Sequence, residues 1–126
     1  MTHTDVEDLA AVWQLQADYA RHVDGRDAAA WSRLFSQNGT LAVGTKEITG
    51  RDALEAFGAG SSAGVHLQGV PSVERGADGR IRAISSFMFV NAETHAVLAG
   101  EYRDDIEQTD EGLVFARRQI EMRVRG

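Results

Sequence analysis

The sequence predicts an α+β domain in which three N-terminal helices cover the concave face of a curved, cone-shaped sheet and enclose a pocket. Two observations lead to this class. Helical hydrophobic spacing dominates the first half of the chain, and strand-like runs separated by short polar turns fill the second half. Helices followed by a meander are typical of domains whose helices pack on one face of an antiparallel or mixed sheet. At 126 residues, we expect a single domain spanning residues 1–126.

The first predicted helix is long, amphipathic and ends at Asp24. Apolar side chains recur at three- and four-residue spacing over about five turns, and Gln16 is the one polar side chain within this stripe. We expect Gly25 to end the helix as a left-handed cap. The apolar members of the stripe are Leu9, Val12, Trp13, Leu15, Tyr19, Ala20 and Val23.

Two shorter helices and a pair of strands are expected next. Asp27 is a suitable N-cap for a second helix, because its carboxylate can accept a hydrogen bond from a free amide of the first turn. Asn38-Gly39 is expected to turn the chain into a strand over residues 40–43, which pairs with a returning strand over 46–49. A third helix is predicted over 51–57, followed by a loop rich in glycine and serine.

Four strands are expected in the second half, over residues 65–75, 80–90, 95–107 and 113–124. Pro71 lies within the first of them, so that strand should be bulged or at the sheet edge there. Small residues in the middle of the central strands leave room between sheet and helices, and we therefore expect a pocket. These residues are Ser85, Ser86, Ala99 and Gly100.

Composition narrows the classes of function. The net charge is −6, with 19 acidic and 13 basic residues, which argues against nucleic acid as the main partner. The absence of cysteine excludes disulfides, thiolate metal sites and a cysteine nucleophile. The N-terminus is acidic, and no apolar run is long enough to cross a bilayer, so we expect no membrane partner and a cytoplasmic location.

Short motifs run along most of the chain in a recognisable order. They are Tyr19-Ala-x-x-x-Asp24-x-x-Asp27, Trp31-x-x-Leu34-Phe35, Gly50-Arg51-Asp52-Ala53, His66-Leu-x-Gly69 and Ala99-Gly100-x-Tyr102-x-Asp104. Their order and spacing resemble the SnoaL-like branch of the nuclear transport factor 2-like superfamily. The resemblance implies the cone-shaped fold and its pocket. The chain departs from the pattern at Leu113, where this family commonly has tryptophan.

The resemblance also implies a catalytic pair. Superfamily members of the scytalone dehydratase and lindane dehydrochlorinase type use an aspartate at the end of the first helix and a histidine at the start of the meander. The matching residues here are Asp24 and His66. The second histidine of scytalone dehydratase falls near Ser86, which indicates a different substrate. The base of the ketosteroid isomerases falls near Val43, which weakens the resemblance to that branch.

An aspartate that orients a neutral imidazole supports proton transfer at carbon or at a leaving oxygen. We therefore expect a cofactor-independent dehydratase, isomerase or cyclase acting on a small, largely apolar molecule with a carbonyl or hydroxyl group. Two side chains are too few to hold a metal ion. The resemblance implies that Tyr102 is a pocket residue, since it matches such a position in the dehydrochlorinase, and strand alternation places further side chains on faces expected to line the cavity. Tyr19 shares at most the margin of one helix face with Asp24. The expected substrate contacts are Tyr19, Ser86, Met88, Tyr102 and Gln119, the last on a face shared with Phe115 and Arg117.

Other interpretations stay open at this point. Asp24 could only cap the adjoining turn, and His66 could be an ordinary strand residue. The domain would then be a non-catalytic binding module, or an accessory subunit such as the small subunits of ring-hydroxylating dioxygenases, which share this fold. We also expect a homodimer through the outer face of the sheet, where Val114, Ala116, Ile120 and Met122 are predicted to lie. Asp104 and Asp105 are expected to be solvated.

Overall fold

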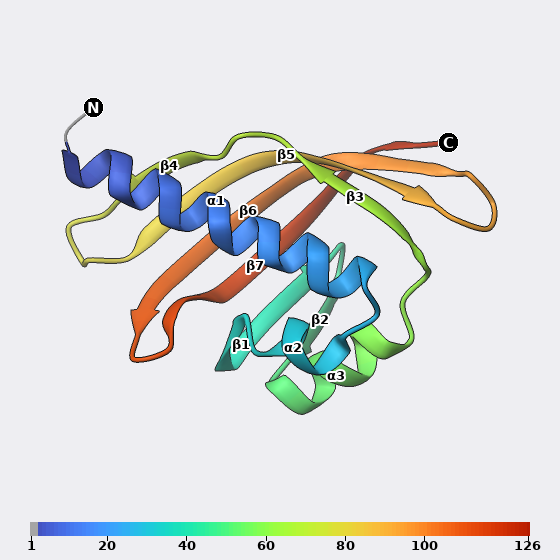
Figure 1. The fold of residues 1–126 in the computed structure, drawn as a ribbon, viewed down its shortest axis with the longest axis horizontal. Helices are drawn as coiled ribbons and strands as arrows, with labels where there is room; N and C mark the ends of the chain where they lie inside the picture. The colour runs from blue at the N-terminus through green and yellow to red at the C-terminus, as the bar shows by residue number, and fades with distance from the viewer. Residues whose placement is uncertain (1–2) are drawn as a thin grey trace.

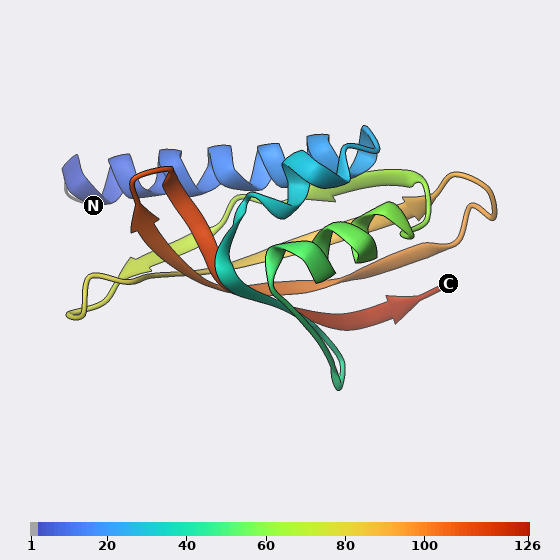
Figure 2. The same ribbon diagram turned by 90° about the horizontal axis from the view of Figure 1, so that it is seen from below.

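The computed structural model describes residues 3–126, with side chains from Asp5 onward. Three helices lie on one side of a single curved sheet (Figures 1 and 2), which confirms the predicted α+β class. The longest helix, α1, lies across the sheet, and the two short helices lie near its C-terminal end. In chain order the elements are α1 (His3–Asp24), α2 (Ala28–Ser32), β1 (Phe35–Val43), β2 (Lys46–Thr49), α3 (Arg51–Ala59), β3 (Gly64–Gln68), β4 (Ser72–Arg75), β5 (Ile81–Asn91), β6 (Val97–Thr109) and β7 (Gly112–Arg125).

The sheet has the strand order β2-β1-β7-β6-β5-β3, and β4 pairs with β5 beyond the end of β3. Every pairing is antiparallel except that of β1 with β7, which is parallel. The parallel pair joins the N-terminal half of the chain to the meander. At the opposite end of this order, β3 is an edge strand, and the side that faces away from β5 has no strand neighbour.

Alternation along β5 defines the inner face of the sheet. Ile81, Ala83, Ser85, Phe87 and Phe89 are buried, and the four residues that alternate with them are exposed. The helix stripe that packs on this face is narrower than predicted, because Trp13 is 48% exposed. Its buried members are Val12, Leu15, Gln16 and Tyr19.

Two bulges change the phase of β7. Asp105 pairs with Arg117 but Ile106 pairs with Phe115, so one extra residue, Ala116, is accommodated in β7. Phe115 and Arg118, three residues apart, are consequently both buried. A second shift lies between Ala99 and Gly100. The prediction that Phe115, Arg117 and Gln119 share one face is therefore wrong.

The residues predicted for the outer face are also corrected. Ile120 and Met122 line an interior cavity, because the bulge at Ala116 turns them inward. Val114 is buried near Leu15 and Leu34, and Ala116 is half-buried. The exposed apolar side chains of the outer face instead lie on β3 and β5, where Leu67 pairs with Met88. A homodimer through the outer face stays a prediction.

Several local boundaries differ from expectation. Asn38 and Gly39 belong to β1, which begins at Phe35, and no turn separates them from it. Gly39 is required here, since a Cβ would lie 2.9 Å from the carbonyl oxygen of Phe115. The run over 65–75 is split into β3 and β4 around Pro71, as its missing amide hydrogen suggested.

The end of α1 is built around Arg26 in place of Gly25. Arg26 has a φ of 64°, and its amide donates to the carbonyl of Val23 at 3.2 Å. The amide of Asp27 donates to the carbonyl of His22 at 2.9 Å, which completes a Schellman motif. The predicted cap of the next helix is present, because the Asp27 carboxylate accepts from the amide of Ala30 at 3.1 Å.

A buried ion pair lies between β6 and β7. Arg118 donates to both carboxylate oxygens of Asp104, at 2.8 and 3.0 Å, and both side chains are fully shielded from solvent. Burial raises the pKa of Asp104, while the charge of Arg118 acts in the opposite direction. The expectation that Asp104 is solvated is wrong, because it faces Arg118 across the ladder on the inner face.

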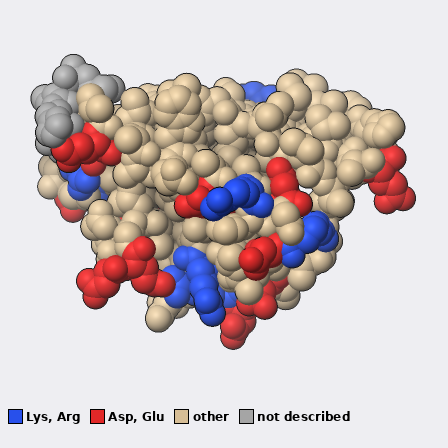
Figure 3. Space-filling model, in the orientation of Figure 1, with Lys and Arg blue, Asp and Glu red and all other residues tan. Residues whose placement is uncertain are grey.

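Charged side chains of both signs are interspersed on the surface seen in Figure 3, and Lys and Arg form no continuous basic area on that face. No helix in the described part of the chain has the length and hydropathy needed to span a membrane.

We predict that Arg26→Gly stabilises the protein. The left-handed conformation costs a non-glycine residue about 1–2 kcal/mol, and the greater freedom of glycine in the unfolded chain offsets about 0.5–1 kcal/mol of the gain. The free energy of unfolding from urea denaturation should therefore rise by about 0.5–1 kcal/mol. His95→Gly, at the other non-glycine residue with a φ of 64°, is the matched control. A loss of stability in Arg26→Gly alone would show that the side-chain contacts of Arg26 outweigh its backbone strain.

We predict that Asp104→Asn destabilises the protein by about 3–5 kcal/mol, because it leaves Arg118 buried without a counter-ion. Asp105→Asn is the control. Its side chain is 35% exposed and pairs with Arg80 at 3.4 Å, so its loss should cost about 1 kcal/mol or less. Urea denaturation measures both. Equal effects of the two substitutions would contradict a structural role for the buried pair.

Candidate active site

A cavity of about 310 Å³ lies between the helices and the inner face of the sheet. Its walls are mainly aromatic and aliphatic, and polar side chains are few. Such a space suits a small, largely apolar molecule. The lining residues are Tyr19, Val23, Trp31, Leu41, Val43, Phe57, Gly58, Gly60, Ser61, Ser62, His66, Phe87, Phe89, Leu98, Tyr102, Ile120 and Met122.

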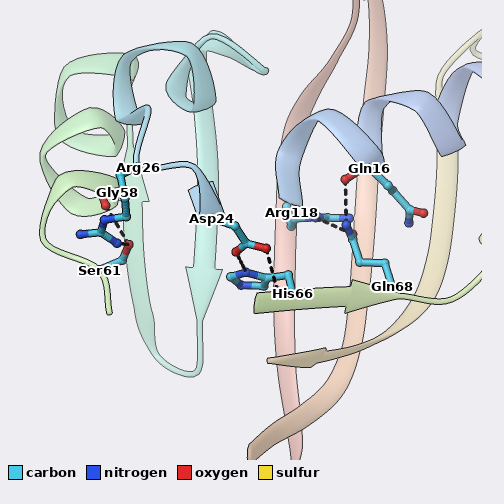
Figure 4. A network of polar contacts seen from close by, with 8 residues as sticks. All are labelled: Gln16, Asp24, Arg26, Gly58, Ser61, His66, Gln68 and Arg118. Atoms are coloured by element: carbon cyan, nitrogen blue, oxygen red, sulfur yellow. Dashed lines mark hydrogen bonds and ion pairs between the residues drawn. The ribbon is translucent and has the colours of Figure 1, made fainter. Parts of the chain in front are cut away.

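Asp24 and His66 meet at this cavity although 42 residues separate them. Asp24 is the last residue of α1, and His66 is the third residue of β3. Asp24 Oδ1 lies 2.6 Å from His66 Nδ1, and Asp24 Oδ2 accepts from the backbone amide of His66 at 2.8 Å (Figure 4). The side chains are 22% and 17% exposed, so both are partly shielded from solvent.

The position of β3 makes this double contact possible. His66 pairs with Phe89 of β5 on one side, and its amide is available to α1 because β3 has no neighbour on the other side. The carboxylate therefore binds the main chain and the ring of the same residue. Two contacts from one rigid group fix both the position and the rotation of the imidazole.

The contact also defines the tautomer. An ionised carboxylate only accepts hydrogen bonds, so the hydrogen of the neutral imidazole lies on Nδ1 and the lone pair on Nε2. No hydrogen bond from the described residues reaches Nε2. The ring is packed against Phe89, with centroids 4.6 Å apart, and against the edge of Tyr19 at 6.2 Å. This arrangement supports general base chemistry at Nε2.

Tyr19 and Tyr102 form the floor of the cavity. Their ring centroids lie 5.7 Å apart, and each ring packs on the guanidinium of Arg118, at 4.3 and 3.7 Å. Burial raises the pKa of the Tyr19 phenol and raises the pKa of Tyr102 well above its ordinary value, while Arg118 acts in the opposite direction on both. Both phenols are therefore protonated at neutral pH.

The other three residues predicted to contact substrate do not line the cavity. Ser86 and Met88 point to the outer face of the sheet, and Met88 is 41% exposed. The alternation of β5 runs one residue out of phase with the prediction, because its inward positions include Ser85 and Phe87. Gln119 borders a shallow depression of the outer face, since the bulge at Ala116 turns Arg118 inward in its place.

Sequence reasoning missed the polar residues behind the floor of the cavity. Arg118, Asp104 and Gln68 are linked by hydrogen bonds, and Gln16 donates to Ser85 Oγ at 2.6 Å. The opposition of Asp104 and Arg118 on neighbouring strands could have been found only with the correct register. Within the described residues, no group of three or more His, Asp and Glu side chains is arranged to hold a metal ion.

We predict that the two tyrosines, which are the only ones in the sequence, do not ionise in the native protein near pH 10. Because their folded pKa values are raised, their contribution to stability is complete below the unfolded pKa of about 10 and is lost as the pH rises above it. Tyrosinate absorbance should therefore appear together with the loss of far-ultraviolet circular dichroism. Ionisation near pH 10 with the dichroism retained would contradict the buried placement, and the urea-unfolded protein provides the reference titration.

Comparison with solved structures agrees with this fold. A putative scytalone dehydratase from Novosphingobium aromaticivorans superposes with a TM-score of 0.85 at 20% identity, covering 100% of this chain and 91% of that one. A type 2 hexachlorocyclohexane dehydrochlorinase gives a TM-score of 0.82 at 14% identity, with coverages of 97% and 89%. An NTF2-like protein with a cystatin-like fold, also from N. aromaticivorans, gives 0.77 at 25% identity, with coverages of 93% and 82%.

No curated protein sequence shows significant similarity to this chain. The model of the SnoaL-like domain, however, matches residues 4–119, which is most of the sequence. Together with the curved sheet and its covering helices, this match establishes the family. The chain belongs to the SnoaL-like domain family, within the nuclear transport factor 2-like superfamily.

Proposed function

We propose that this protein is a cofactor-independent acid/base enzyme, a dehydratase, isomerase or cyclase, that acts on a small and largely apolar molecule carrying a carbonyl or hydroxyl group. The observation that carries the proposal is the double contact of the Asp24 carboxylate with the ring and the main chain of His66. A purely structural cap needs only the main-chain contact. The additional contact at Nδ1 selects the tautomer that a general base requires.

In the proposed mechanism, His66 Nε2 removes a proton from a carbon next to the carbonyl group of the substrate. The positive charge that develops on the imidazole is stabilised by Asp24, 2.6 Å from Nδ1. The protonated ring can then return the proton to another carbon or give it to a departing hydroxyl. The first outcome is isomerisation and the second is dehydration. In cyclisation, the carbanion attacks a second carbonyl carbon and the protonated ring gives its proton to the resulting alkoxide.

The cavity supports the proposed class of substrate. Its volume of about 310 Å³ is near the lower end of the range usual for small-molecule sites. Its mainly apolar walls lower the local dielectric, which strengthens the interaction of the imidazolium with Asp24. Tyr19 and Tyr102 border the same space with neutral phenols, and we propose that they contact the oxygen on which negative charge develops.

The names of structurally similar proteins support the proposed class of reaction. These proteins include a putative scytalone dehydratase and a dehydrochlorinase. Both names describe eliminations, which begin with the kind of proton removal proposed here. We further propose that the protein acts in the cytoplasm.

We predict that His66→Ala lowers kcat/KM by about 10²–10⁴-fold while the fold is retained, because the base is removed from a cavity and not from a packed core. A panel of enones, β-hydroxy ketones and polyketide-like aromatics, followed by absorbance and mass spectrometry, identifies a substrate. Asp24→Asn should have a similar effect, since an amide hydrogen directed at Nδ1 would move the ring hydrogen to Nε2. His95→Ala, at a hairpin tip, is the control.

The outcomes separate the competing functions. Wild-type rates in His66→Ala would exclude this dyad as the base. Binding of panel compounds in calorimetry without turnover by the wild type would favour a non-catalytic binding domain. Co-elution with a larger partner and no binding of small molecules would favour an accessory subunit.

A further inference from the structure

The strand that carries His66 has no apolar anchor on its inner face. Val65 and Leu67 point outward and are 55% and 61% exposed, while His66 and Gln68 alternate with them and are half-buried. Packing of β3 against α1 is therefore limited to the contact of the His66 ring with Tyr19. Its position beneath the helix depends on polar contacts and on its ladder with β5.

Two residues of β3 make polar contacts with α1. The first contact joins His66 to Asp24, and the second is made by Gln68. Its Nε2 donates to the main-chain carbonyl of Gln16 in α1 at 2.7 Å, and its Oε1 accepts from Arg118 Nη1 at 3.4 Å (Figure 4). A carbonyl only accepts and a guanidinium only donates, so the orientation of the Gln68 amide is determined. The side chain thus joins β3 to the helix on one side and to the core on the other.

Arg118 is a fixed point in this arrangement. Its guanidinium is fully buried and is held by both oxygens of Asp104 and by the faces of Tyr19 and Tyr102. The helix is fixed as well, because the Gln16 side chain donates to Ser85 of β5 at 2.6 Å. Gln68 therefore bridges two groups that are themselves immobilised by the surrounding core.

We propose that Gln68 is a positioning residue for His66. Asp24 holds β3 at residue 66 and the Gln16 carbonyl holds it at residue 68, on the same face of the strand. The ladder with β5 holds one side of β3, and these two attachments restrain its other side, so the loss of one would give the strand more freedom to twist at His66. Loss of the Gln68 contacts would let the imidazole move relative to the Asp24 carboxylate and to the cavity. This inference rests on the proposed role of His66 as the base.

Gln68→Leu tests the inference, with Gln119→Leu as the matched control. Gln119 is also a half-buried strand glutamine, but it lies on the opposite face of the sheet. For Gln68→Leu we expect about tenfold faster hydrogen exchange at the His66 amide, the scale set by loss of one to two hydrogen bonds. The imidazole nitrogen resonances of His66, assigned by difference from His66→Ala, should shift from those of the single Nδ1–H tautomer toward those of a mixture of tautomers.

With a substrate from the panel, the kcat of Gln68→Leu should fall about tenfold with little change in KM. Gln119→Leu should match the wild type in all three measurements.

Gln68→Glu isolates the contact with the helix and covers the case in which Gln68→Leu does not fold. The carboxylate can still accept from Arg118 but cannot donate to the Gln16 carbonyl. The same shifts in exchange and resonances are expected. Wild-type exchange and resonances in both folded variants would overturn the positioning role.

The nuclear magnetic resonance measurements need no substrate, so the two proposals fail separately. Unchanged His66 signals in the Gln68 variants would leave the dyad mechanism standing. Full turnover by His66→Ala would contradict the dyad mechanism, even if the Gln68 variants change the resonances of the imidazole.

Discussion

The buried ion pair between Asp104 and Arg118 is the interaction on which the arrangement of the site depends. It places a cation, fully shielded from solvent, directly behind the floor of the cavity. The guanidinium packs on the rings of Tyr19 and Tyr102 and contacts Gln68 of β3. A planar cation with five donors can organise aromatic and polar neighbours at the same time, which lysine or an apolar side chain could not do. The desolvation cost of such a pair is large, so it is better understood as a means of specifying geometry than of adding stability.

This polar centre explains how a cavity and an ordered site coexist in a small domain. A hollow next to the main core removes packing contacts that would otherwise fix the surrounding side chains. Hydrogen bonds with definite donors and acceptors replace them at Asp24, His66 and Gln68. The aromatic residues provide apolar contact area, and the polar residues provide orientation. The imidazole of His66, the proposed base, is therefore held by direction-dependent contacts in the region where packing is weakest.

The sequence predicted the features that depend on local pattern. The stripe of α1, the cap at Asp27 and the order of helices and strands follow from periodicity and turn chemistry. The approach of Asp24 to His66 was available only through the resemblance to a family, since nothing local to either residue implies a partner 42 positions away.

Local pattern could not supply the phase of the strands. An extra residue at Ala116 reverses the alternation of β7, and this reversal decides which of Arg117, Arg118 and Gln119 is buried. Such a bulge is fixed by the partner strand and leaves no clear trace in composition. The wrong prediction for Ser86 and Met88 has a different cause. The inner face of β5 can be recognised in the sequence from its alternating apolar residues, which are Ile81, Ala83, Phe87 and Phe89. The small size of a strand residue does not by itself indicate a cavity wall, since Ser85, the inward serine, accepts a hydrogen bond from Gln16.

The proposed site contains few polar groups, and this limits the chemistry that it can direct. One base faces a cavity whose remaining walls offer shape, two neutral phenols and few other polar groups. In the proposed mechanism, such a site accelerates proton removal but does not itself select the subsequent step. The outcome depends on the bound molecule: a β-hydroxyl group leads to elimination, a conjugated double bond to isomerisation, and a second carbonyl within reach to ring closure. Changes in the apolar wall would thus alter which molecule is held and in what pose, and so alter the reaction without any change in the dyad. Under the proposed mechanism, we therefore expect specificity to depend on Phe57, Phe89, Leu98 and Met122, and reactivity to depend on Asp24 and His66.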